Sequence, residues 1–391
     1  MLSSAKKNIT ILFIGLFLTI IFLFFKSSIP PAKFLHLKIY DTLNKIEYKL
    51  RKIPPKIKDI VIVGIDNETI GKLPYRWPYP RSVFANTIKN LIKAQAKVIA
   101  FDFVFLGKSE DTEDQILETV LVNNNKIILA STIDETGSIN IRSLSKLGAK
   151  TPSGIVTKIQ DMDGIIRKNL TYMISDEVPP RGFLSWEMAI IKASEGLSLT
   201  PVKGNECLIS IINDKFEKWF IPVDRNNKSF IINFRAHTGD FTRLSFYDAY
   251  KGTFDPNVAK DKIVLIGFVS SLLGDIHNSP IGWMPGITLN ANSLLTLYTR
   301  SFIRFMPSGI EHFLTLMGVI VSIMLILLLD MRAAYIFISI EILIFFAASY
   351  ILLTTGYVWN YFSFPFCVGI IPALSRKIYT IIWERKKVYW T

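Results

Sequence analysis

The sequence predicts an α/β domain, with a mainly parallel sheet flanked by helices, anchored by four transmembrane α-helices, one N-terminal and three C-terminal. Short segments rich in valine and isoleucine alternate with stretches of helical spacing, and four longer apolar segments lie near the ends of the chain. The composition suits this mixture. A hydrophobic fraction of 50% and a mean hydropathy of +0.34 are high for a soluble protein, whereas 20% charged residues is high for a membrane bundle alone.

The first apolar segment, Ile9–Phe25, contains 17 residues and no charge, which is near the lower limit for crossing a bilayer. A cleaved signal peptide is the alternative. Ser27 and Ser28 are small, but no A-x-A pattern follows the segment, so we expect an uncleaved anchor. Three further spans are predicted at about Ile310–Leu329, Ala333–Leu353 and Val358–Leu374.

Short basic segments predict the orientation of these spans. Lys6 and Lys7 precede the first span, Arg332 lies in the turn between the second and third, and the tail 375–391 is basic. Four spans place all three segments in the cytoplasm. We therefore expect a multi-pass protein of the cytoplasmic (inner) membrane, in contact with the lipid bilayer, with residues 1–8 and 375–391 inside and residues 26–309 as one extracytoplasmic domain.

One ionisable residue falls within a predicted span. Glu341 lies in the segment YIFISIEILIFF, and a carboxyl group at that depth is costly, which makes it a functional candidate. It is expected to be protonated or to pair with Arg376 or Lys377 from the adjacent span. Structural pairing of this kind is favoured over a signalling role.

The extracytoplasmic segment contains alternating strands and helices. Buried parallel strands are predicted at 59–65, 97–105, 126–133 and 262–267, because these segments are short and almost continuously apolar. Helices are predicted at 81–96, 111–122, 185–193 and 289–298, and antiparallel or edge strands at 207–212 and 229–234. Residues 134–182 have the least regular pattern.

Three acidic residues are candidates for a ligand-binding site, because open α/β sheets bind ligands at the carboxyl ends of their strands. Asp66 follows the first strand, Asp102 lies within the second, and Asp275 comes shortly after the last. Arg81 begins a predicted helix, where a cation opposes the helix dipole unless a carboxylate or ligand compensates it. The alternative is that Asp66 and Asp102 cap loops and that Arg81 pairs with one of them.

The segment DMDGIIR, residues 161–167, predicts a tight acidic turn that leads into a strand. Gly164 is expected to take a positive φ, with Asp161, Asp163 and Arg167 as structural residues of the turn. A calcium loop is the alternative. The residues after the glycine are Ile, Ile and Arg, and no glutamate stands at the twelfth position, so the ligands that calcium requires are lacking.

Other kinds of function lack support in the sequence. The pairs His237/Asp240 and Asp275/His277 fall short of a three-ligand metal site, and no common catalytic motif occurs, so we expect no catalytic residues, no metal and no cofactor. The net charge of +13 forms no compact basic stripe, which argues against nucleic-acid binding. Cys207 in the domain and Cys367 in a span are not expected to pair.

The order of motifs resembles the second type of CHASE domain, an extracellular sensory domain associated with cyclases and histidine kinases. The resemblance covers about residues 33–305 in collinear order. The matching stretches are DIVIVGID (59–66), WPYPR (77–81), VIAFDFVF (98–105), DMDGIIR (161–167), KIVLIG (262–267), DIHNSP (275–280) and MPGITLNA (284–291). The pattern positions include Trp77, Arg81, Asp102, Asp163, Arg167 and Asp275.

This resemblance implies a sensor of an unknown extracytoplasmic ligand, with Asp66, Trp77, Arg81, Asp102 and Asp275 as candidate binding residues. The printed chain stops 17 residues after Leu374 without a cyclase or kinase domain, so a stand-alone form without its own output is expected. A separate cyclase or kinase and a second copy of the chain are candidate partners by analogy. The alternatives are a non-signalling envelope binding or scaffold protein, and an enzyme that uses Asp66, Asp102 and Asp275.

Overall fold

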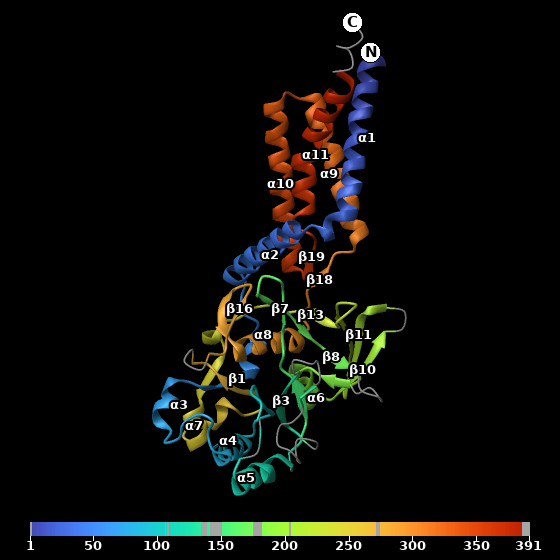
Figure 1. Ribbon diagram of the computed structural model, residues 1–391. Coiled ribbons are helices and arrows are strands. Elements are labelled where there is room, and N and C mark those ends of the chain that lie inside the picture. The colour runs from blue at the N-terminus through green and yellow to red at the C-terminus, as the bar shows by residue number, and fades with distance from the viewer. Residues whose placement is uncertain are drawn as a thin grey trace. The chain divides into compact units, whose positions relative to one another are not determined.

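The computed structural model describes residues 2–105, 107, 109–122, 124–133, 139–140, 151–174, 182–202, 205–270 and 274–384 (Figure 1). The chain divides into two compact units. One comprises Met1–Glu47 and Arg304–Thr391, and the other comprises Tyr48–Ile303.

The first unit is built on four long apolar helices that run side by side: α1 (Leu2–Phe25), α9 (Ser308–Leu328), α10 (Met331–Thr354) and α11 (Ser363–Tyr379) (Figure 1). All four are long and apolar enough to cross a membrane, as the sequence predicted. Buried residues of α1, α9 and α11 form an apolar cluster of Ile11, Val319, Ile323, Cys367, Val368 and Ile371, and α10 packs against α9 through Ile326, Ala334 and Ile338. The ion pair between Lys26 and Glu311 and the amphipathic helix α2 (Pro30–Leu50), which continues into the second unit, were not predicted.

The last span begins later than predicted. Val358 lies in the short strand β19 (Tyr357–Val358), which pairs in parallel with β18 (Arg304–Phe305). The helix α11 begins at Ser363. Just before it, the side chain of Asn360 accepts hydrogen bonds from the backbone N–H groups of Phe362 and Ser363, both at 3.0 Å. These bonds satisfy two N–H groups at the start of the helix.

The second unit contains the predicted parallel sheet. Its strand order is β14-β1-β15-β2-β3-β4, and β5 also pairs with β3. The four predicted strands are β1 (Ile60–Ile65), β2 (Val98–Phe101), β3 (Ile127–Ile133) and β15 (Ile263–Phe268), and all are joined in parallel. The added strands are β14 (Thr242–Ser245) and β5 (Ser153–Ile155), both parallel, and β4 (Ile139–Asn140), which is antiparallel.

Alternate residues of the strands enter two separate apolar cores, one on each face of the sheet. Ile60 and Ile62 lie in the first core, while Val61, Val63 and Ile65 lie in the second. The first core receives α6 (Trp186–Glu195) and α8 (Gly286–Tyr298), and the second receives α4 (Arg81–Lys93), α5 (Asp111–Val122) and α7 (Phe246–Lys251). Strands covered on both faces explain why their sequences are continuously apolar.

Antiparallel strands complete this unit, including both of the segments expected to be antiparallel or edge strands. The three-stranded sheets are β10 (Leu197–Val202), β11 (Asn205–Asn213) and β12 (Lys218–Pro222), and β13 (Ser229–Ile231), β7 (Ile166–Leu170) and β6 (Ile159–Gln160). The hairpins are β8 (Tyr172–Ile174) with β9 (Gly182–Leu184), and β16 (Ile276–Ser279) with β17 (Gly282–Pro285). The short helix α3 (Asn67–Lys72) follows β1.

Candidate functional site

A cavity of about 530 Å³ lies where β2, β3 and β15 end. Its volume suits a small-molecule ligand, and its position is the usual one for ligands of parallel sheets. The polar lining consists of Asp102, Thr132, Thr157, Lys158, Gln160, Asp275, His277 and Asn290, and the apolar lining of Phe103, Val104, Val156, Ile166, Phe268, Gly286 and Leu289. We call this space the strand-end cavity.

Asp102 is held at the end of β2 by backbone and side-chain hydrogen bonds. Its N–H donates to the carbonyl oxygen of Ile266 at 2.8 Å, which continues the pairing of β2 with β15. The side-chain amide of Asn290, on α8, donates to its carboxylate at 2.5 Å. Burial, reinforced by the nearby carboxylate of Asp275, raises the pKa of Asp102 well above its ordinary value.

Asp275 is positioned by the start of α8 and by a histidine. Its carboxylate is 2.9 Å from Nε2 of His277, and its carbonyl oxygen accepts a hydrogen bond from the N–H of Gly286 at 3.0 Å. A Cβ atom at position 286 would collide with this carboxylate, which would have to shift to make room for it. The pair formed by Asp275 and His277 therefore faces the cavity in a defined position.

Lys158 brings a cation to the cavity, but a buried partner neutralises it. Its ammonium group lies 2.9 Å from Glu187, whose side chain is completely buried. The other carboxylate oxygen of Glu187 accepts a hydrogen bond from Asn169 at 2.7 Å, and the same amide donates to Ser293 on α8 at 2.6 Å. Removing this lysine would leave a buried, unpaired charge, so the pair has a structural role as well as facing the cavity.

Trp77 and Arg81 lie in a different cavity, of about 490 Å³, whose lining includes five aromatic side chains and which we call the aromatic cavity. Arg81 is 3.4 Å from Asp114, and its guanidinium lies over the ring of Phe105. The expected compensation at the start of α4 is therefore real, but Asp114 provides it rather than Asp66 or Asp102. Glu113 adds to it by accepting a hydrogen bond from the N–H of Ser82 at 2.6 Å.

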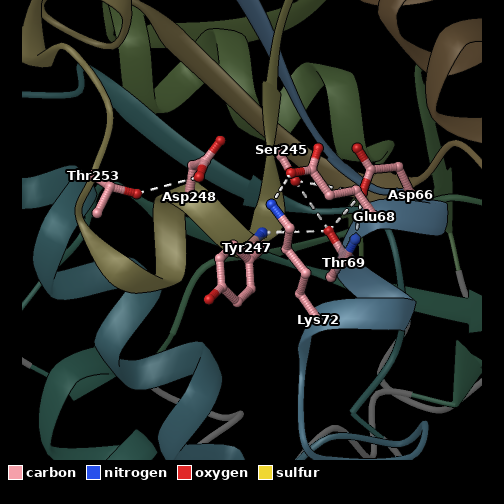
Figure 2. Close-up of polar contacts among 8 residues, drawn as sticks. All are labelled: Asp66, Glu68, Thr69, Lys72, Ser245, Tyr247, Asp248 and Thr253. Carbon is pink, nitrogen blue, oxygen red and sulfur yellow. Dashed lines mark hydrogen bonds and ion pairs between the residues drawn. The ribbon is translucent and has the colours of Figure 1, made fainter.

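Asp66 caps the helix that follows β1 (Figure 2). Its carboxylate accepts hydrogen bonds from the N–H of Thr69 at 2.8 Å and from the hydroxyl of the same residue at 2.7 Å. The hydroxyl of Ser245, on β14, lies 3.4 Å from the same oxygen. Asp66 thus connects α3 to the edge of the sheet and does not line the strand-end cavity. The capping role that the sequence offered as an alternative is confirmed for Asp66, whereas the pairing with Arg81 that went with it is not.

The acidic segment 161–167 forms a tight turn between β6 and β7. Gly164 has a φ of +74°, and the carbonyl oxygen of Asp161 accepts a hydrogen bond from its N–H at 2.9 Å. The buried guanidinium of Arg167 contacts Asp161 at 2.8 Å and binds both oxygens of Asp163 at 2.9 and 2.8 Å. Within the described ranges, no three His, Cys, Asp or Glu side chains are grouped closely enough to hold a metal ion.

Glu341, on α10, accepts a hydrogen bond from the hydroxyl of Ser322, on α9, at 2.9 Å. Arg376 instead donates to the carbonyl oxygen of Ile326 at 3.3 Å. Across the described part of the chain no ion pair joins Glu341 to Arg376 or Lys377. Of the two states expected from the sequence, pairing with a cation is therefore not found, and Glu341 contacts a hydroxyl group of the neighbouring helix.

The structure therefore distributes the five candidate ligand residues over three places. Asp102 and Asp275 share the strand-end cavity, Trp77 and Arg81 share the aromatic cavity, and Asp66 is a helix cap. An enzyme site built from all three aspartates is thus not assembled. Lys158, Glu187 and Asn290 were not predicted from the sequence as site residues. For Asn290 a signal was present, because it is one of several polar residues in the otherwise apolar helix GITLNANSLLTLY.

A parallel α/β unit with a cavity at its strand ends, together with four apolar helices of spanning length, points to a membrane protein with a separately folded α/β domain. The chain belongs to the CHASE2 domain family, whose model matches residues 14–329, which confirms the resemblance seen in the sequence. CHASE2 is a family of extracellular sensor domains. No curated protein matches the chain, and no solved structure matches it either.

Proposed function

We propose that this chain is a membrane-anchored extracytoplasmic sensor and that the strand-end cavity receives its signal molecule. The observation that carries the proposal is the placement of Asp102, Asp275, His277 and Lys158 around one cavity at the carboxyl ends of parallel strands. Membership of a sensor-domain family supports the sensory role, and the four apolar helices support the membrane anchor.

Helix α8 connects the cavity to the rest of its unit, which makes it the element that a ligand would move. Asn290 contacts Asp102, and Ser293 contacts the amide that holds Glu187. Farther along, Asn292 accepts hydrogen bonds from the N–H groups of Arg235 and Ala236 at 2.8 and 3.0 Å. A ligand that binds better to one position of α8 would shift the population towards that position.

The orientation and the output are also part of the proposal. The chain continues from α8 to the apolar helix α9, so a displacement of α8 would reach the membrane helices along the covalent chain. We place both termini in the cytoplasm and assign the output to a separate cyclase or kinase. A scaffold role in the envelope is the alternative, and it predicts ligand binding without any such partner.

The native cysteines provide a test of orientation. Cys207 is exposed, whereas Cys367 is buried in α11. A membrane-impermeant maleimide should label Cys207 in intact spheroplasts, and the variant Cys207→Ser should lose the label. In that variant background, Ser4→Cys should react only after permeabilisation. Labelling of Cys207 only in permeabilised cells would reverse the proposed topology.

Ligand binding is tested by obstructing the cavity. Thr157 is an exposed lining residue, and Thr112 is an exposed residue of α5 that does not line it. The full chain in detergent is screened for compounds that raise its melting temperature. The rise should disappear in Thr157→Trp and persist in Thr112→Trp. A compound that stabilises both variants equally would place the binding site elsewhere.

A further inference from the structure

The strand-end cavity has a surplus of hydrogen-bond acceptors and of acidic groups. Lys158 is neutralised by Glu187 at 2.9 Å, which leaves the carboxylates of Asp102 and Asp275 as the remaining acidic groups of the lining. His277 is the other titratable group there, and it contacts Asp275 at 2.9 Å. Two carboxylates that repel one another in a partly buried space favour a ligand that brings positive charge.

A third acceptor lies beside them. Asn290 is 4% exposed and lines the cavity, and its amide nitrogen donates to Asp102. Among the described residues its carbonyl oxygen Oδ1 has no hydrogen-bond partner. A buried amide oxygen without a donor costs free energy, so a ligand that donates N–H groups would remove that cost.

We propose that the ligand of the strand-end cavity is a small organic cation with a primary ammonium group, held by the carboxylates of Asp102 and Asp275 and by Oδ1 of Asn290. An ammonium group has three N–H donors, which matches three acceptors. A metal ion fits less well, because the described side chains include no group of three ligating His, Cys, Asp or Glu residues. The apolar lining from Phe103, Phe268 and Leu289 suits an alkyl chain on the ligand.

This inference rests on the proposed function. Three probes of matched length test the charge of the ligand separately from the proposal that the cavity binds a ligand. The probes are 4-aminobutan-1-ol, 4-hydroxybutanoate and butane-1,4-diol, which differ in charge at one end. Each is added at pH 8 to the full chain in detergent, and the melting temperature and dissociation constant are measured. Because burial raises the pKa of Asp102, an alkaline pH favours its ionised form.

Only the amine is expected to stabilise the protein. Asp102→Asn and Asp275→Asn should each weaken its binding at least about tenfold, because each removes a charged hydrogen-bond partner. Asp255→Asn is the matched control, because Asp255 is an exposed cap outside the cavity lining and asparagine also caps. Binding in this variant should be unchanged. Gel filtration checks that all three variants remain folded.

Several outcomes would overturn the proposal. If the acid or the diol stabilises the chain as much as the amine, the ligand is not an organic cation. If that stabilisation is lost in Thr157→Trp, the cavity would still be the binding site, but for a ligand of a different kind. Stabilisation by magnesium chloride that is lost in Asp102→Asn would identify a metal site. If the amine has no effect at tens of millimolar, the ammonium assignment fails, whereas the cavity is judged by the compound screen.

Discussion

Asn290 on α8 donates a hydrogen bond to Asp102 at the end of β2 across 2.5 Å, although 188 positions separate the two residues in the chain. The contact joins a helix of one apolar core to the floor of the strand-end cavity. It holds a partly buried carboxyl group that lines a cavity. The acidity of this group therefore provides a direct test of the site.

Asp102→Asn should stabilise the protein at neutral and alkaline pH. Because burial and Asp275 raise the pKa of Asp102 in the folded state, the folded chain binds more protons than the unfolded chain above the ordinary aspartate pKa of about 3.9. Stability should therefore fall as the pH rises from that value to the raised pKa and then level off. The melting temperatures of the natural chain and of Asp102→Asn should coincide near pH 4, and at pH 8 the variant should have the higher melting temperature. Identical pH profiles would show that Asp102 ionises normally.

Lys158→Met should destabilise the protein by about 3–5 kcal/mol, because Glu187 would keep a charge in a completely buried position. The second change Glu187→Met, made in that variant, should recover part of the loss, since no uncompensated charge would remain. Thermal and chemical denaturation in detergent measure both effects. A single variant as stable as the natural chain would mean that Glu187 is protonated or hydrated.

Arg167→Lys should cost about 1–3 kcal/mol, because lysine cannot replace the two-oxygen contact with Asp163 while also reaching Asp161. Arg300→Lys is a matched control. Arg300 also binds a carboxylate, that of Glu217, at 2.7 Å, but both side chains are exposed. The change should therefore lower the free energy of unfolding by less than about 1 kcal/mol. Equal losses would contradict a special role of the turn.

Gly286→Ala should lower stability by about 1–3 kcal/mol and disturb the position of Asp275, because the added methyl group meets that carboxylate directly. Gly71→Ala, in α3, adds the same methyl group where no atom lies within 4 Å, and it should be neutral or slightly stabilising. Melting temperatures compare the two variants. A tolerated Gly286→Ala would show that Asp275 can move without cost.

The four apolar helices, the four parallel strands of the sheet and most of the helices around it could be predicted from the sequence alone. These features follow from local periodicity and composition, which each segment carries independently of its neighbours. The late start of α11 was missed because Val358 pairs as a strand with the distant segment Arg304–Phe305, a contact that the apolar character of the segment does not reveal. The strand β14 was missed because TRLS is short and half polar.

Which polar residues contact one another depends on the tertiary structure. The sequence places Arg81 at the start of a helix and Asp66 at the end of a strand, but it does not show their partners. In the structure Arg81 pairs with Asp114, and Asp66 accepts a hydrogen bond from Thr69 as a helix cap. Such pairings depend on strand order and on how helices pack on the sheet, and no local pattern records either. The same packing brings Lys158 next to Glu187 on α6. It also places Asp102 and Asp275, which are far apart in the sequence, in the lining of one cavity.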